Sequence, residues 1–126
     1  GLIAEHGIAW LLPRLIGEAK ALDLLLSARI FKGVEAEILG LVNKSLPAEE
    51  LENFVENYTK HLVERVSPRS MTIMKRQIRA GYSQTFSESL EIADKEMFLS
   101  FEQDDFKEGV ESFVENRVPQ FRGVGK

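Results

Sequence analysis

Apolar side chains recur every three or four positions along nearly the whole chain, which is the period of an amphipathic α-helix. The longest example is residues 48–66, where one stripe contains Leu51, Phe54, Val55, Tyr58, Leu62 and Val66. The other helices are expected to bury Ile8, Leu11, Leu12 and Leu15; Leu22, Leu25 and Leu26; Met71, Met74 and Ile78; Leu90, Ala93, Met97 and Phe101; and Phe106, Val110 and Phe113. A further short helix is expected in "VEAEILG". The pattern predicts a mainly α fold in which strands hardly figure.

Glycine, proline and capping residues indicate where these helices begin and end. Three glycines are expected to end helices: Gly17, Gly40 and Gly81. Pro13 is expected to kink or divide the first helix, and Leu41–Val42 to form a brief extended piece. Ser67 is expected to cap a helix whose first turn contains Pro68. Two later pairs have the spacing of a capping box: Thr85 with Glu88, and Asp105 with Glu108.

The composition and charge of the chain argue against several classes of protein. The chain has 126 residues, 44% hydrophobic and 29% charged, which suits one globular domain with its own core. The net charge of -4 does not favour a nucleic-acid partner. The absence of cysteine excludes a disulfide framework and fits a cytoplasmic location. No stretch approaches the roughly 20 apolar residues of a membrane span. The start at Gly1, without Met or signal peptide, indicates processing, a cut or a cloned piece.

Two stretches of sequence, taken together, are typical of one enzyme family. The opening "GLIAEHGIAWLLPRLIGEAKALDLLLSARIFKGVEAEILGLVNKSLP" resembles a glycine-bounded turn, a helix ending "LPRLVG", a second helix, an "A…GLV" element and a Pro. The closing pattern is an acidic pair, Phe, Glu-Gly, Phe and Arg-x-Pro-x-Phe, found here at Asp104, Asp105, Phe106, Glu108, Gly109, Phe113, Arg117, Pro119 and Phe121. By both stretches the chain resembles the crotonase superfamily, the enoyl-CoA hydratases and isomerases.

The resemblance covers only the C-terminal half of a family member. It implies that residues 1–47 end the crotonase-like core with its active-site helix, and that residues 48–126 form a helical lid and oligomerisation region. The remaining N-terminal half would hold the ββα sheet core and the two backbone N–H groups of an oxyanion hole. We therefore expect a fragment that is inactive alone, and whose parent combines both halves in a homotrimer or hexamer.

Glu5 is the candidate catalytic residue. It lies between Ile3 and Ile8, near Trp10, just before the first expected helix. A carboxylate placed in this way can take a proton from a carbon that an adjacent thioester makes acidic. The turn "AEHG" is similar to the "PEG" or "PDG" turn of the family's isomerases, with Ala4 in place of Pro. In those enzymes the acid moves a proton between C2 and C4 of the acyl chain, whereas hydratases often carry Gly. Alternatively, Glu5 only supports the helix N-terminus.

Other residues are candidates for binding an acyl-CoA substrate. Trp10, Phe98 and Phe101 could border an acyl pocket, with ordinary packing as the alternative. Arg76 and Arg79 belong to a basic helix side that could meet the phosphates of coenzyme A, with a solvated face as the alternative. The family usually has a coenzyme-binding Lys where this chain has Asn116, which cannot supply that charge.

No separate cofactor is expected, because coenzyme A belongs to the substrate. The two histidines, His6 and His61, lack partners at metal-ligand spacing, so no metal site is expected. The resemblance implies fatty acid metabolism by an isomerase or a lyase, and leaves the choice between them, and the acyl-chain length, open. The alternative function is a helical oligomerisation or binding module without catalysis.

Overall fold

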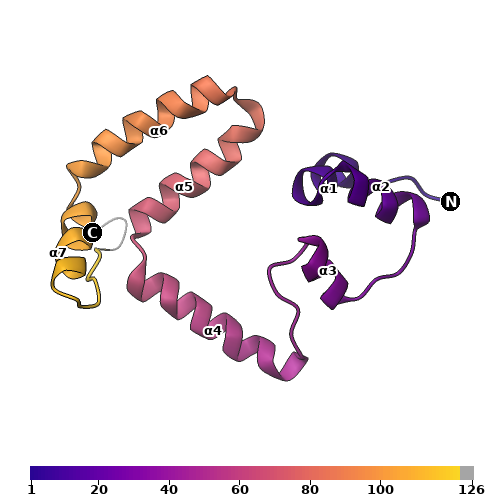
Figure 1. The fold of residues 1–126 in the computed structure, drawn as a ribbon, viewed down its shortest axis with the longest axis horizontal. Coiled ribbons are helices and arrows are strands. Elements are labelled where there is room, and N and C mark those ends of the chain that lie inside the picture. The colour runs from indigo at the N-terminus through magenta and orange to yellow at the C-terminus, as the bar shows by residue number, and fades with distance from the viewer. Residues whose placement is uncertain (123–126) are drawn as a thin grey trace. The chain divides into compact units, whose positions relative to one another are not determined.

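The computed structural model describes residues 1–122, and every regular element within that range is a helix (Figure 1). The mainly α prediction is therefore confirmed. The chain divides into two compact units, residues 1–53 and the part from residue 54 onward. The division falls inside the helix of residues 48–65, whereas the expected boundary, between residues 47 and 48, precedes that helix. The roles expected for residues 1–47 and 48–126 stay predictions.

In the first unit, α1 (Ile8–Ile16) and α2 (Glu18–Ser27) pack together as a helical hairpin joined by Gly17 alone. Gly17 has a φ of 85° and donates its N–H to the Pro13 carbonyl at 2.9 Å, so it ends α1 as expected. Helix α1 continues through Pro13, which does not divide it. The core of the hairpin consists of Leu12, Ile16, Ala21 and Leu24.

The buried face of α2 differs from the expected one. Leu22 is exposed and Leu26 is 80% exposed, whereas Ala21 and Leu24 are buried. A one-residue connection brings the two helices close together, and the small side chain of Ala21, 1% exposed, fits the space between them. The expectation that Leu22 and Leu26 form the buried side was therefore wrong.

The first unit continues with α3 (Gly33–Leu39), the short helix expected there. Gly40 ends it with a φ of 84°, and the Leu41 N–H donates to the Ala36 carbonyl at 2.8 Å. Leu41 and Val42 lie in a bend and not in an extended piece. A hydrogen bond from Lys44 and another from the Ser45 N–H lower the pKa of Glu37 and hold this bend to α3.

Helix α4 (Ala48–Arg65) begins in the first unit and continues into the second. Its boundaries agree with the sequence pattern, but it has no buried residue. Leu51, Phe54, Val55 and Tyr58 are exposed, and the rings of Phe54 and Tyr58 stack with centroids 6.4 Å apart. The apolar stripe of α4 thus exists as predicted and lies bare in this chain.

In the second unit, α5 (Pro68–Ala80) and α6 (Phe86–Phe101) are joined by the short 3-10 helix η1 (Gly81–Ser83) and pack as a hairpin (Figure 1). The caps predicted for α5 and α6 are confirmed. The Ser67 hydroxyl accepts from the Ser70 N–H at 3.0 Å, and Thr85 forms a capping box with Glu88. The last helix, α7 (Asp104–Val114), contacts α6.

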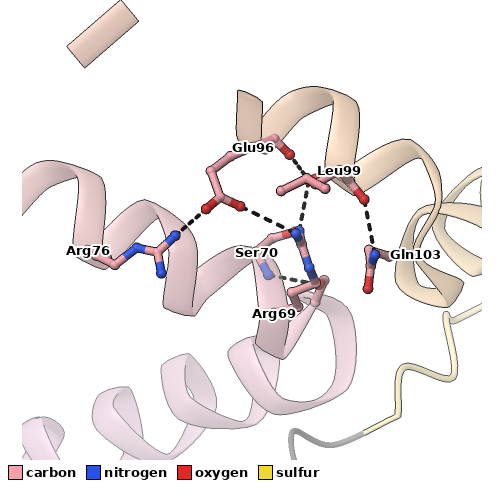
Figure 2. A network of polar contacts seen from close by, with 8 residues as sticks. Arg69, Ser70, Arg76, Glu96, Leu99 and Gln103 are labelled. Carbon is pink, nitrogen blue, oxygen red and sulfur yellow. Dashed lines mark hydrogen bonds and ion pairs between the residues drawn. The ribbon is translucent and has the colours of Figure 1, made fainter. Parts of the chain in front are cut away.

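The contact between α5 and α6 includes a polar network that was not expected from the sequence. The carboxylate of Glu96 on α6 accepts from Arg76 and, at 3.4 Å, from Arg69, both on α5 (Figure 2). The apolar residues expected to face inward on these two helices are largely exposed: Met74, Ile78, Leu90, Met97 and Phe101. A stripe on one helix predicts burial only if a partner covers it, and here α5 and α6 cover each other's stripes only in part.

The tail after α7 folds back onto that helix. The Glu108 carboxylate accepts from Arg117 Nη1 at 2.5 Å and from Arg117 Nη2 at 3.0 Å. It also accepts from the Gln120 N–H at 2.6 Å. The expected capping box of Asp105 and Glu108 was wrong, because Gln103 is the N-cap of α7 and Glu108 binds the tail. Asp105 instead accepts from the Ser67 hydroxyl, which ties α7 to the start of α5.

Candidate functional site

Glu5 lies at the start of a tight turn that leads directly into α1. His6 and Gly7 both have left-handed backbone conformations, with φ of 53° and 78°. The Ile8 N–H donates to the Glu5 carbonyl at 3.1 Å and closes the turn. The Trp10 and Leu11 N–H groups each donate to the Gly7 carbonyl at 3.0 Å. The turn and the first helical turn therefore form one hydrogen-bonded piece, which fixes the backbone of Glu5 relative to Trp10.

The Glu5 carboxylate is exposed and, among residues 1–122, has no hydrogen-bond or ion-pair partner. Its neighbours Leu2 and Ile3 are 85% and 86% exposed, and Trp10 is half exposed. Ile8, which the sequence had suggested as a neighbour of the carboxylate, packs against the α1–α2 core. This chain thus presents a carboxylate beside apolar side chains that it leaves uncovered.

Trp10 contacts Arg14 one helical turn away. The Arg14 Cζ lies 3.9 Å from the centroid of the Trp10 ring, and Arg14 Nη1 donates to the Trp10 carbonyl at 2.7 Å. Arg14 was not predicted as a site residue, although its spacing of four residues from Trp10 is the signal that could have identified it.

Phe98 and Phe101 lie at the C-terminal end of α6, in the second unit. Their rings meet edge to face with centroids 6.3 Å apart, and Phe101 also meets Phe106 of α7 at 5.1 Å. Phe98 and Phe101 are both exposed. They are available for an apolar ligand, and their participation in one pocket with Trp10 stays a prediction.

Arg76 and Arg79 differ in what they already bind. Figure 2 shows Arg76 directed at Glu96, with which it forms an ion pair across the hairpin. Among the described residues Arg79 forms no ion pair, and neither does Lys75. Together with Thr72 and Ala80, these three basic residues line a shallow depression on α5. The depression could receive an anion, and Lys75 belongs to it as much as the two arginines do.

A cavity of about 490 Å³ lies within the second unit and was not anticipated from the sequence. Its apolar wall contains Phe106, Val110, Phe113 and Phe121, and Ser67 and Ser100 contribute hydroxyl groups. It depends on the tail, since Phe121 comes from beyond α7, and helix periodicity cannot predict such a return of the chain. The tail is held by Glu108, whose pKa is lowered to about 2 by hydrogen bonds from Arg117 and from the Gln120 N–H.

Two further observations concern the described part of the chain. Within residues 1–122, no group of three or more His, Asp or Glu side chains comes together in a way that could hold a metal ion. None of the helices in that range has the length and apolar character needed to cross a membrane.

Known proteins match this chain over almost its full length. The family model described as enoyl-CoA hydratase/isomerase matches residues 1–124. A probable enoyl-CoA hydratase of Bacillus subtilis is 36% identical over 98% of this chain and 48% of its own length. The 1,2-epoxyphenylacetyl-CoA isomerase of Escherichia coli is 28% identical over 98% of this chain and 47% of its own. A probable enoyl-CoA hydratase/isomerase from Mycobacterium abscessus has a similar structure, with a TM-score of 0.88, 27% identity, and coverage of 98% of this chain and 48% of that one. The chain spans about half the length of the curated relatives it matches.

Proposed function

The chain belongs to the enoyl-CoA hydratase/isomerase family, and on that premise we propose that it supplies the C-terminal half of an enzyme that acts on acyl-CoA thioesters. The proposed reaction is proton transfer through a thioester enolate, closer to that of the isomerases than to that of the hydratases. The oxyanion hole that holds the developing charge lies outside this chain. The chain alone is then inactive.

One observation carries the proposal: Glu5 is a carboxylate that has no partner among residues 1–122, and it lies on a fixed turn next to exposed apolar side chains. A base must reach its substrate proton, and a carboxylate already bound to an arginine or a helix cap would be unsuited to that role. Covering Leu2 and Ile3 would exclude water from around Glu5 and keep the transferred proton from being lost to solvent. Glu5 would remove a proton from C2 of the thioester and return it at C4.

The proposed binding roles depend on which side chains are exposed and which already have an ion-pair partner. Trp10, Phe98 and Phe101 present exposed aromatic surface and are proposed to contact the acyl chain. Arg79 and its neighbour Lys75 are proposed to meet the phosphates of coenzyme A. Arg76 contributes less, because its guanidinium already pairs with Glu96.

The test replaces the aligned half of the Bacillus subtilis relative with this chain and measures turnover of a 3-enoyl-CoA. We expect Glu5→Gln to lower kcat by about 10²- to 10⁴-fold, the usual contribution of a general base, with little change in KM. Glu49→Gln is the matched control, since Glu49 is an exposed glutamate in the first turn of α4. Circular dichroism and elution volume establish that each chimera folds and assembles as the parent does.

Two results would count against this proposal. Equal turnover by the parent chimera and its Glu5→Gln variant would remove Glu5 as the base. Turnover of the same substrate by the pure 126-residue chain would show that the oxyanion hole does not lie elsewhere.

The second candidate is a helical oligomerisation or binding module, and the bare stripe of α4 favours it. A stripe of this size in water is typical of a surface that another polypeptide covers. Sedimentation of the pure chain separates the two candidates. A defined trimer or hexamer that binds no acyl-CoA favours the module. Aggregation, relieved by a companion polypeptide together with acyl-CoA binding, favours the half-enzyme.

A further inference from the structure

Trp10 is held in place by a residue four positions further along α1. The Arg14 guanidinium lies over the indole ring, with Cζ 3.9 Å from its centroid. The same guanidinium donates from Nη1 to the Trp10 carbonyl at 2.7 Å. A flat guanidinium over the face of an indole is attracted by the electrons of the ring, and the bond to the carbonyl fixes where the guanidinium lies. Arg14 thus contacts both the ring and the backbone of one residue.

The backbone carbonyl of Trp10 is the second contact of the Arg14 guanidinium. It accepts the arginine side chain at a length typical of a strong, charge-assisted bond. The spacing of four residues between Trp10 and Arg14 therefore places a charged group against a half-exposed indole.

We propose that Arg14 is a positioning residue, which acts through Trp10 by holding the indole in the one orientation that borders the acyl group. This inference rests on the proposed function, because it uses Trp10 as part of the acyl site. A half-exposed tryptophan on a helix has several open rotamers, so an unrestrained indole would close the site only part of the time. Arg14 itself does not touch the substrate.

The chain offers a direct readout, since Trp10 is its single tryptophan. Fluorescence lifetimes and acrylamide quenching of the 126-residue chain report the orientation and accessibility of this indole alone. We expect Arg14→Met to raise the population of other rotamers about two- to fivefold, the change that corresponds to an exposed cation–π contact. Arg14→Lys should restore part of the effect, because it keeps the charge and loses the flat face. Arg65→Met, at another exposed helical arginine, is the control.

A second arm tests whether the positioning serves substrate binding. In the chimera described above, Arg14→Met should raise KM for the 3-enoyl-CoA while kcat changes little. The same substitution should have no further effect in a Trp10→Leu background, because there is then no indole to hold. Far-UV circular dichroism verifies that α1 is intact in every variant.

Three results would overturn the positioning role of Arg14. Unchanged Trp10 fluorescence in Arg14→Met would overturn the inference, whatever the kinetics show. An equal rise of KM in the Trp10 and Leu backgrounds would also overturn it, since Arg14 would then act directly. If Trp10→Leu itself leaves KM unchanged, Trp10 is not part of the acyl site, and the positioning role is overturned while Glu5 catalysis is tested separately by Glu5→Gln.

Discussion

Ser67 joins two helices of the second unit, α5 and α7, so its removal should cost more stability than the loss of an ordinary helix cap. Its hydroxyl accepts from the Ser70 N–H at 3.0 Å, as an N-cap does, and donates to the Asp105 carboxylate of α7. Ser67 is also one of the few buried polar residues among those described. Ser67→Ala therefore removes the cap of α5 and the link between α5 and α7 in one step.

The expected magnitude combines two contributions. An N-cap serine replaced by alanine costs about 1 kcal/mol. A hydrogen bond to a charged acceptor contributes about 1.5 kcal/mol more when it is partly shielded from water. We expect Ser67→Ala to lower the free energy of unfolding by roughly 2.5 kcal/mol. Thr85→Ala, at the exposed capping box of α6, should cost only about 1 kcal/mol and is the matched control.

The assay is urea unfolding of the chain followed by far-UV circular dichroism, with Asp105→Asn and the double variant completing a cycle. The cycle should give a coupling of about 1 kcal/mol between Ser67 and Asp105, since the two side chains share one hydrogen bond. If Ser67→Ala costs no more than Thr85→Ala, or if the two single effects simply add, the link to α7 contributes nothing to stability.

Two further predictions concern the tail and a helix end. The Glu108 carboxylate has its pKa lowered from 4.5 to about 2 in the folded chain, so its contribution is complete above pH 4.5 and disappears as the pH falls toward 2. The difference in melting temperature between the parent chain and Glu108→Gln should therefore be constant above about pH 5 and shrink below it, and a difference that does not change with pH would contradict this. Gly40→Ala should destabilise the chain by about 1 kcal/mol because Gly40 has a φ of 84°. Gly81→Ala, at a φ of -57° with open space around it, should be neutral or slightly stabilising in the same urea titration.

Apart from the cap of α7, the helix boundaries were predictable because they depend on local chemistry. Gly17 and Gly40 end helices through left-handed backbone that other residues adopt at a cost. Thr85 and Glu88 cap a helix because the side chain of each accepts from the backbone N–H of the other. The buried faces were predicted less well. Leu22 and Met97 lie on apolar stripes as expected, but burial depends on which partner packs there, and the sequence of one chain does not contain that information.

In the candidate site, too, the local features were predictable and the contacts between distant residues were not. The turn at Glu5 could be located from its resemblance to the family, and the Trp10–Arg14 contact follows from helical spacing. The Glu108–Arg117 ion pair could not be predicted, because it joins residues nine apart across the end of α7. The pairing of Glu96 with both Arg69 and Arg76 depends on the register of α5 against α6, which no local pattern specifies.

The exposed stripe of α4 makes the timing of synthesis important. The helix needs only short-range contacts and forms within about a microsecond, long before any other polypeptide can diffuse to it. From that moment Phe54 and Tyr58 face water, and newly made copies can adhere to one another through them. The yield of correctly assembled protein therefore depends on whether a partner polypeptide covers the stripe of α4 before the copies aggregate. Lowering the rate of expression should raise this yield.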